Sequence, residues 1–432
     1  MFTRDISLED CVLDLVDNSI DSLVYTKGIE VSASIDSLAL AAERSESATL
    51  PDINITLSQE RVVIDDRCGG ISREAAETYV FNFGSAPGHA DKTLGAYGIG
   101  MKRAIFKIGN TILIESKRQT DGFRVELKDV EEWSKTDEDL ADWRIPIEDL
   151  APVASPADMG VTITITNLHD EVKMRLQDGG LEGNLRSAVQ QTYCMFLDRF
   201  VTVSLNEKPV PPNLIAIAES DALPPSIDKF HADGVEVTLI AGPAPKDLWT
   251  TDRAGWYVLC NGRVVLKADK TELTAWGPPR PIFQNKYNGF VGVAFFQSKD
   301  PLLLPWTTTK RGLNRESAVY QLARNKMAGI AGPFLKFCSG MYPSELHEQP
   351  VERVLSEALK PADLRSLVSR PNSMFTGVKQ SNRLRKTTTQ ISYTAEIDLV
   401  ERIKKHLRRP NMSNPAVGRH TFDHYIKREC PK

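Results

Sequence analysis

Four polar residues share one face of a helix that the sequence predicts near the start of the chain. They fall at positions i, i+3, i+4 and i+7, and they are Asp14, Asp17, Asn18 and Asp21. Such a stripe is often a solvated face, but apolar residues occupy most of the remaining circumference and no Lys or Arg stands one turn away. Carboxylate and amide oxygens suit a magnesium ion that takes its other ligands from water and phosphates. The stripe therefore predicts a phosphate-binding segment elsewhere in the chain.

A glycine-rich run from Gly95 to Lys102 is the candidate for that segment, because a helical pattern follows it directly. Its glycines permit positive φ, and the helix start aims free N–H groups and the positive end of its dipole at an anion. Lys102 adds a positive charge. A glycine-rich turn alone is weak evidence, and this run lacks the GK[ST] ending of a Walker loop and the βαβ order of a dinucleotide fold.

A third motif lies between these two, where a β pattern ends in Asp65 and Asp66 and enters a turn with Gly69 and Gly70. A carboxylate in this position can accept a hydrogen bond from an exocyclic amine such as that of adenine. The alternative is a simple β-turn, since Asp-rich turns are frequent.

The order and content of the three motifs resemble the GHKL superfamily, which includes gyrase B, MutL, the ninety-kilodalton heat-shock chaperones, histidine kinases and MORC proteins. The Gly-Met-Lys ending of the third motif is most similar to MORC-like proteins. The resemblance implies that Asn18 binds magnesium, that Asp66 binds adenine and that Ile71 to Leu94 form an ATP lid. The ATP-binding residues that it implies are Asn18, Asp21, Asp66, Gly70, Ile71, Gly95, Gly98, Ile99, Gly100, Met101 and Lys102.

The sequence departs from the family pattern at three positions. The general base of the family is a glutamate four residues before the asparagine, and that position is Asp14 here. Aspartate is one methylene shorter, so slow hydrolysis is expected. Cys68 stands where the family usually has a glycine, and Val161 stands where it has a threonine.

A second region resembles the transducer domain of MutL and gyrase. Asn261-Gly262-Arg263 follows a β pattern, and Pro305 to Lys310 resembles the loop that carries the switch lysine. The resemblance implies that Lys310 reaches the γ-phosphate and neutralises charge that develops on the transferred group. The alternative is an ordinary surface lysine.

The secondary-structure pattern predicts an α+β fold. A helix over 6–25, capped by Ser7, precedes a hairpin at 53–57 and 61–64, and then the glycine-rich run and a helix over 101–108. Strands follow at 111–116, 123–127 and 161–166, and a helix is expected over 184–200. A second set of strands is expected at 201–205, 235–240, 256–260 and 290–296, with a helical region beyond Pro333 and a helix over 395–409.

These elements imply three parts. We expect a Bergerat-type two-layer α/β sandwich ATPase domain over 1–200 and a transducer-like, ribosomal S5 domain 2-like α/β domain over 201–335. A helical, basic C-terminal region over 336–432 completes the chain, with a linker at 381–390.

Composition is that of a globular protein, with 41% hydrophobic and 25% charged residues among 432. Six cysteines lie far apart without a CxxC pair, and no stretch approaches the roughly 18 apolar residues of a membrane span, so a cytoplasmic protein with reduced thiols is expected.

Charge is distributed unevenly along the chain. Residues 361–432 contain 15 Lys and Arg against 6 Asp and Glu, whereas the whole chain has a net charge of -4. The basic side chains of the last predicted helix are Arg402, Lys404, Lys405, Arg408 and Arg409. They predict either contact with nucleic acid or a partner protein, or simply a solvated helix face.

Two functions are consistent with the sequence. The first is a slow ATPase in which Mg²⁺ and ATP order the lid and drive N-terminal dimerisation, with Asp14 and Lys310 as the catalytic residues; dimerisation is implied by the resemblance alone. The second is a nucleotide-gated binding protein with negligible turnover, which acts on nucleic acid or a partner protein.

Overall fold

The structure is a computed structural model that describes residues 6–27, 50–81, 100–133, 145–220, 223–341, 359–375, 391–392 and 394–430. The chain divides into two compact units, Met1–Val378 and Lys379–Lys432. Within the described residues the first unit contains two large sheets with helices packed on them, so the predicted α+β class is confirmed.

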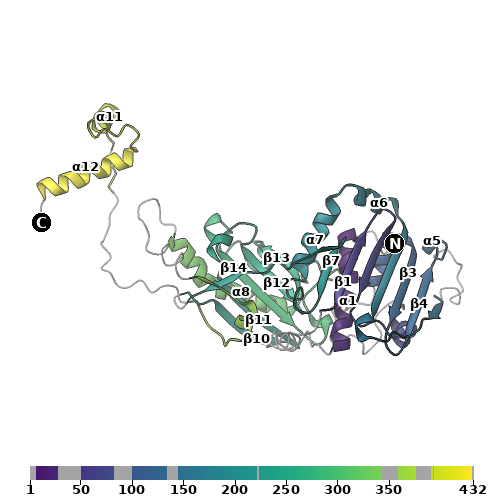
Figure 1. The fold of residues 1–432 in the computed structure, drawn as a ribbon. Helices are drawn as coiled ribbons and strands as arrows, with labels where there is room; N and C mark the ends of the chain where they lie inside the picture. The colour runs from purple at the N-terminus through teal and green to yellow at the C-terminus, as the bar shows by residue number, and fades with distance from the viewer. Residues whose placement is uncertain are drawn as a thin grey trace. The chain divides into compact units, whose positions relative to one another are not determined.

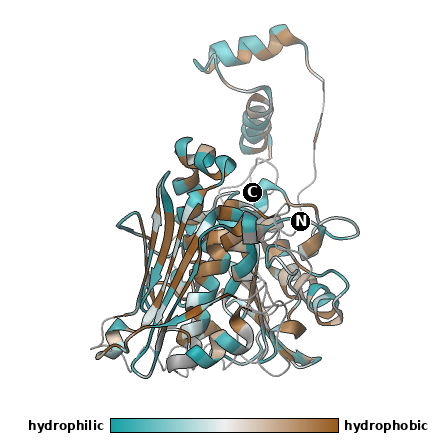
Figure 2. Ribbon diagram, turned by 90° about the vertical axis from the view of Figure 1, so that its right-hand side faces the viewer, coloured by the Kyte–Doolittle hydropathy of each residue, from teal (hydrophilic) through white to brown (hydrophobic). Residues whose placement is uncertain are grey.

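The first sheet has eight strands in the order β5-β4-β3-β6-β2-β1-β7-β8. Their bounds are β1 Asp52–Leu57, β2 Arg61–Asp66, β3 Gly109–Lys117, β4 Gly122–Leu127, β5 Ile147–Asp149, β6 Gly160–Leu168, β7 Thr202–Leu205 and β8 Lys208–Pro209. β1 and β2 form the predicted antiparallel hairpin, with Ile55 opposite Ile64. Hydrophobic and hydrophilic residues alternate along the strands (Figure 2), as expected for a sheet with one buried face.

The main helices of this part are α1 Leu8–Lys27, α4 Gly100–Ile108, α6 Asp170–Gln177 and α7 Gly180–Thr192. Shorter turns are α3 Arg73–Ala75, the π-helical η1 Ala76–Val80, α5 Val130–Trp133 and η2 Pro156–Asp158. Ser7 caps α1 as predicted, because its Oγ accepts a hydrogen bond from the Asp10 N–H at 3.1 Å. α1 contacts α4, α7 and β2, and Figure 1 shows α1 beside α7.

The end of α7 differs from the sequence prediction. The helix was expected to continue to residue 200, but it ends at Thr192, and the following residues form turns in which Asp198 has a φ of 60°. β7 was expected in the second domain, but it pairs in parallel with β1, with Thr202 opposite Asp52. The unpaired edge of β1 accepts this strand, so the first sheet continues past the expected boundary at residue 200.

The second sheet has the order β10-β11-β14-β12-β13, and α8 packs on β10, β11 and β14. The bounds are β10 Ser226–Ala232, β11 Val235–Pro243, β12 Gly255–Cys260, β13 Arg263–Asp269, β14 Phe290–Gln297 and α8 Ala318–Met341. Short 3-10 turns connect them: η3 Lys246–Leu248, η4 Glu272–Thr274, η5 Asn285–Tyr287 and η6 Pro301–Leu303. A small pair joins β9 Ile217–Glu219 to β15 Lys360–Ala362, and α10 Leu364–Ser369 follows.

α8 also begins earlier than the sequence indicated. The helical region was expected beyond Pro333 and a boundary was expected at residue 335, but α8 starts at Ala318 and runs across both positions. A proline removes one helical hydrogen bond. Residues on both sides of it, such as Ala331 and Phe334, are buried, and this packing maintains the helix through Pro333.

The hairpin between β12 and β13 brings the second sheet to the helices of the first. Its two turn residues, Asn261 and Gly262, have φ angles of 46° and 83°, as in the two-residue turns that suit strand twist. A Cβ on Gly262 would lie 2.9 Å from the ring of Phe196, so only glycine allows this approach. β13 also contacts α7, as Figure 1 shows.

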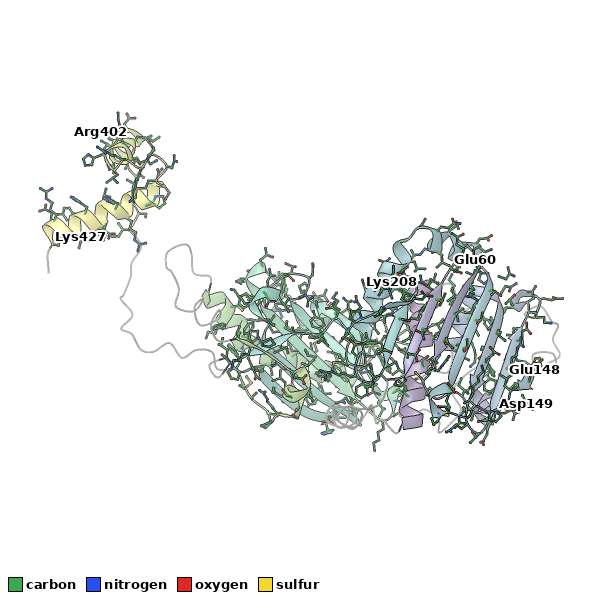
Figure 3. The ribbon with its side chains drawn as sticks, viewed as in Figure 1. Glu60, Glu148, Asp149, Lys208, Arg402 and Lys427 are labelled. Atoms are coloured by element: carbon green, nitrogen blue, oxygen red, sulfur yellow. The ribbon has the colours of Figure 1, made fainter. Side chains whose placement is uncertain are left out.

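The C-terminal unit contains α11 Ile397–His406 and α12 Asn414–Glu429, which pack on each other. Among the described residues of this unit only Val417 is buried. Arg402 and Lys427 project from these helices, just as Glu60, Glu148, Asp149 and Lys208 project from the rim of the first sheet (Figure 3). The expected linker at 381–390 lies outside the described residues. No described helix is both long enough and apolar enough to span a bilayer.

Candidate functional site

The polar stripe of α1 is buried rather than solvated. Asp14, Asp17 and Asp21 are 5%, 0% and 7% exposed, and Asn18 is half-buried. A buried carboxylate must be paired or hydrogen-bonded, so each of these side chains has to find a partner inside the fold. For Asp14 and Asp17 the partners come from parts of the chain that are distant in sequence.

Asp14 faces the start of α4. Its Oδ2 lies 3.1 Å from the Arg103 guanidinium and would lie 3.3 Å from a Cβ on Gly100. Burial raises the pKa of Asp14, and the positive charges of Lys310 and Arg103 oppose that rise. A carboxylate whose pKa is raised accepts a proton more readily, which is a property of a general base.

Asp17 is fully buried in a cluster of three partners. Lys310 Nζ lies 2.6 Å from its Oδ2, while Arg263 Nε and the Tyr193 hydroxyl lie 2.9 Å and 2.7 Å from its Oδ1. Burial acts to raise the pKa of Asp17, but Arg263 and Lys310 outweigh this effect and hold it below its usual value. Asp17 is therefore an ionised carboxylate that joins α1 to the second sheet.

Asp66 ends β2 and points into the fold. Its side chain accepts hydrogen bonds from the Ser19 hydroxyl at 2.7 Å, from the Cys68 N–H at 2.9 Å and from the Val161 N–H at 3.3 Å. Burial raises the pKa of Asp66, and these hydrogen bonds oppose the rise. The backbone contact with Val161 occurs although the family threonine is absent at that position, because it uses a main-chain donor.

Two glycines allow the strands to close around Asp66. A Cβ on Gly160 would lie 1.8 Å from the Asp66 carbonyl oxygen, so β6 can lie this close to the end of β2 only without a side chain there. Gly70 has a φ of +75°, and a Cβ on it would lie 2.7 Å from the Lys117 carbonyl oxygen. Ile71 is then held by Ser116, whose Oγ accepts from the Ile71 N–H at 2.7 Å.

Of the glycine-rich run, the structure describes only the last three residues, 100–102. Gly100 begins α4, Met101 is half-buried and Lys102 is buried. Burial lowers the pKa of Lys102 to about 8. Gly95, Gly98 and Ile99 lie outside the described residues, as does the expected lid from residue 82 onward.

The side-chain amide of Asn18 is the group that would bind magnesium in this site. Its amide nitrogen Nδ2 is buried and has no hydrogen-bond partner among the described residues. No cluster of three or more His, Cys, Asp or Glu that could hold a metal occurs within those residues. Because Nδ2 is an N–H donor and cannot bind a metal, an ion here would take the amide oxygen of Asn18 as its one protein ligand and complete its shell with water and phosphate oxygens.

Lys310 is not an ordinary surface lysine, because it is only 6% exposed. It lies in a tight loop in which the Thr307 N–H donates to the Gly312 carbonyl at 2.9 Å and the Lys310 N–H donates to the Thr307 carbonyl at 2.8 Å. Lys310 has a φ of 55°, which is uncommon for a residue with a side chain. Buried Trp306 anchors the start of the loop through its indole N–H, 3.0 Å from the Pro301 carbonyl.

Sequence reasoning missed four partners at this site. Ser19 and Arg103 each directly follow a predicted site residue, and Arg263 was recognised only as part of a turn motif. These neighbours could have been tested as candidates on the basis of their position. Tyr193 carries no sequence signal, because nothing in its surroundings predicts that its hydroxyl meets a carboxylate on α1.

Comparison with known proteins agrees with this geometry. Residues 6–154 match the family model described as histidine kinase-, DNA gyrase B- and HSP90-like ATPase. No curated protein matches the chain. The matched segment spans α1 to β5, whereas β6, which lies between β3 and β2 in the sheet, comes after it. The N-terminal part of this chain, residues 6–154, is therefore similar to the ATPase domains of the GHKL superfamily.

Proposed function

We propose that the chain binds Mg²⁺ and ATP between α1 and the start of α4 and hydrolyses the ATP slowly. Nucleotide binding orders the lid and drives N-terminal dimerisation, so that the protein acts as an ATP-dependent clamp. One observation carries this proposal: Asp14 on α1 lies against Gly100 at the start of α4, while Lys310 reaches Asp17 on α1 from the loop before α8.

Each residue has a definite role in the proposed site. Asn18 would hold the magnesium ion through its amide oxygen, and the ion would neutralise phosphate charge. Asp66 would accept the adenine amine, because a carboxylate has more acceptor sites than its three protein donors use. Its anionic form matters, since a protonated carboxyl loses acceptor capacity.

The phosphates would meet the N-terminus of α4, where backbone N–H groups and the helix dipole favour an anion. Lys102 lies in the first turn of this helix and carries a positive charge below pH 8. Lys310 would approach from the other side and stabilise the γ-phosphoryl group.

Asp14 would orient or deprotonate the attacking water. Its contact with Arg103 fixes the carboxylate but also withdraws negative charge from it. The shorter side chain and this ion pair both support slow turnover. They equally favour the second candidate, a nucleotide-gated binding protein with negligible turnover.

The client of such a clamp would be nucleic acid or a partner protein. Arg402, Lys405, Arg408 and Arg409 are exposed on and after α11, where they can contact an anionic surface. A MORC-like or MutL-like relationship and a cytoplasmic location belong to the same proposal.

We predict that Asp66→Asn weakens ATP binding by about tenfold or more, because a hydrogen bond to a charged group contributes about 1.5–3 kcal/mol. Asn18→Ala should remove the part of the affinity that depends on magnesium. Titration calorimetry with magnesium and with EDTA measures both effects. Asp65→Asn is the matched control, since Asp65 contacts Arg67 and Thr162 instead. Unchanged affinity in Asp66→Asn would show that the adenine assignment is wrong.

A second prediction concerns pH. Lys102 is charged below its pKa of about 8 and loses that charge as the pH rises through it. ATP affinity should therefore fall by about tenfold between pH 7 and pH 9, since each unit above the pKa reduces the charged fraction tenfold. Lys102→Arg should keep its affinity over this range, and Lys102→Met should be weak throughout.

Lys107→Met is the control for this pH experiment. Lys107 lies at the other end of α4 and pairs with Glu171 at 2.5 Å near the surface. Its substitution should leave the pH dependence of wild type in place. A wild-type affinity that is flat from pH 7 to pH 9 would exclude Lys102 from phosphate binding.

A third prediction addresses the clamp. A non-hydrolysable ATP analogue should shift sedimentation toward a dimer where ADP does not, because only a γ-phosphate engages Lys310. Lys310→Met should abolish the shift. Identical sedimentation profiles with both nucleotides would remove dimerisation from the proposed function.

A fourth prediction concerns hydrolysis. General-base assistance is typically worth about 10²–10⁴-fold, so Asp14→Ala should lower turnover by a sizeable part of that range with ATP affinity nearly intact. Because the pKa of Asp14 is raised, wild-type turnover should fall at a higher pH than for an ordinary aspartate as the solution is acidified. Asp14→Glu restores the family residue and should raise the rate. Equal phosphate release from wild type and Asp14→Ala would favour the nucleotide-gated binder.

A further inference from the structure

The proposed reaction assigns no task to Asp17, although this carboxylate is the most deeply buried charge on α1. It is 0% exposed and is held by Lys310, Arg263 and Tyr193. Its partners come from three different places: the segment after α7, the start of β13 and the loop before α8. Asp17 is therefore a point where α1 meets the residue after α7, the start of β13 and the loop before α8.

A buried ion pair is a weak source of stability, because the desolvation of both charges opposes their attraction. Well-packed apolar side chains would join the same elements at least as firmly. What a satisfied polar network adds is a fixed geometry. The arrangement around Asp17 therefore indicates that the network fixes the position of one of its own side chains.

Lys310 is the group whose position this network sets. Its ammonium is fixed by Asp17 Oδ2, and its carbonyl oxygen accepts a hydrogen bond from Arg263 Nη1 at 2.7 Å. Both ends of the residue are thus held by one cluster. The left-handed backbone of Lys310 supports this view, because such a conformation persists only where the surroundings impose it.

The charges of the cluster leave Lys310 active toward an anion. Asp17 supplies one negative charge, while Arg263 and Lys310 supply two positive charges. Arg263 offsets the carboxylate, so the ammonium is not fully neutralised by its contact. An ammonium also has three N–H donors, of which the contact with Asp17 occupies one.

From this geometry we infer that Asp17 is a positioning residue that aims Lys310 at the γ-phosphate, with Arg263 as its counter-charge, and that it thereby sets the preference for a nucleoside triphosphate over a diphosphate. The inference rests on the proposed function, because it requires that a nucleotide binds at α1. Asp17 acts through Lys310 and touches no reacting atom itself.

The chain provides a matched contact for comparison. Asp10 lies two turns before Asp17 on α1, and it forms an ion pair with Arg311, the residue after Lys310. This pair joins the same helix to the same loop, but its side chains are 21% and 35% exposed. Asp10→Asn therefore breaks a contact between the same two elements without removing the partner of Lys310.

The test compares two nucleotides on each variant. Dissociation constants for MgADP and for a non-hydrolysable MgATP analogue give a preference ratio for the γ-phosphate. Lys310→Met should reduce this ratio by about tenfold, as expected for one hydrogen bond between charged groups. Asp17→Asn should reduce it to the same value, and the double variant should not fall further, because both act through one contact. Asp10→Asn should retain the wild-type ratio.

A merely structural role for Asp17 would lower the affinity for both nucleotides or the melting temperature and leave the ratio unchanged, which would overturn the inference. Additive losses in the double variant would overturn it as well. If Asp17→Asn does not fold, Tyr193→Phe removes a neutral hydrogen bond from the same carboxylate, and the ratio should fall by a smaller factor; an unchanged ratio there contradicts the inference. Wild type that binds neither nucleotide would instead overturn the proposed function itself.

Discussion

The need to pair buried carboxylates constrains how α1 packs in the first unit. α1 turns its acidic face inward, and each carboxylate there would be costly without a partner. Arg103 meets Asp14 from α4, Arg263 meets Asp17 from β13, and Lys310 meets Asp17 from the loop before α8. The pairing fixes how α1, α4 and the second sheet pack, because displacement of any of them would leave a charge unpaired.

Glycines supply the second constraint, since they permit the close approaches that the pairing requires. Gly100 lets the start of α4 reach Asp14, and Gly160 lets β6 pass the backbone of Asp66. Gly262 lets the β12–β13 hairpin approach Phe196 and so carries Arg263 into the cluster. A side chain at Gly160 or Gly262 would push apart elements that the charges hold together, and one at Gly100 would crowd the Asp14 carboxylate.

Local patterns in the sequence predicted much of the fold. The apolar spacing of α1, the β1–β2 hairpin and the start of α4 after the glycine-rich run depend on neighbours within a few residues, and all three are confirmed. The end of α7 and the partner of β7 were both missed. β7 pairs in parallel with β1, a strand far away in the sequence, and such a pairing leaves no local signal. The same holds for the site. Its residue types could be predicted from motifs, but the contact between Asp17 and Lys310 could not, because the two residues lie 293 positions apart in the sequence.

The division of the site between α1 and the loop before α8 has a thermodynamic consequence. In the proposed function the amide and carboxylates come from α1 and the γ-phosphate contact comes from the loop, so neither element forms a complete site alone. A ligand can shift the equilibrium between two packing arrangements of these elements only by the difference in its affinity for the two arrangements. Under the proposed function ATP would have such a difference where ADP would not, because only its third phosphate would reach Lys310. By reciprocity, any partner that favours the packed arrangement must raise the affinity for ATP by the same factor. Under the proposed function the Asp17 cluster would then be the element through which a client bound elsewhere and a nucleotide bound at α1 influence each other.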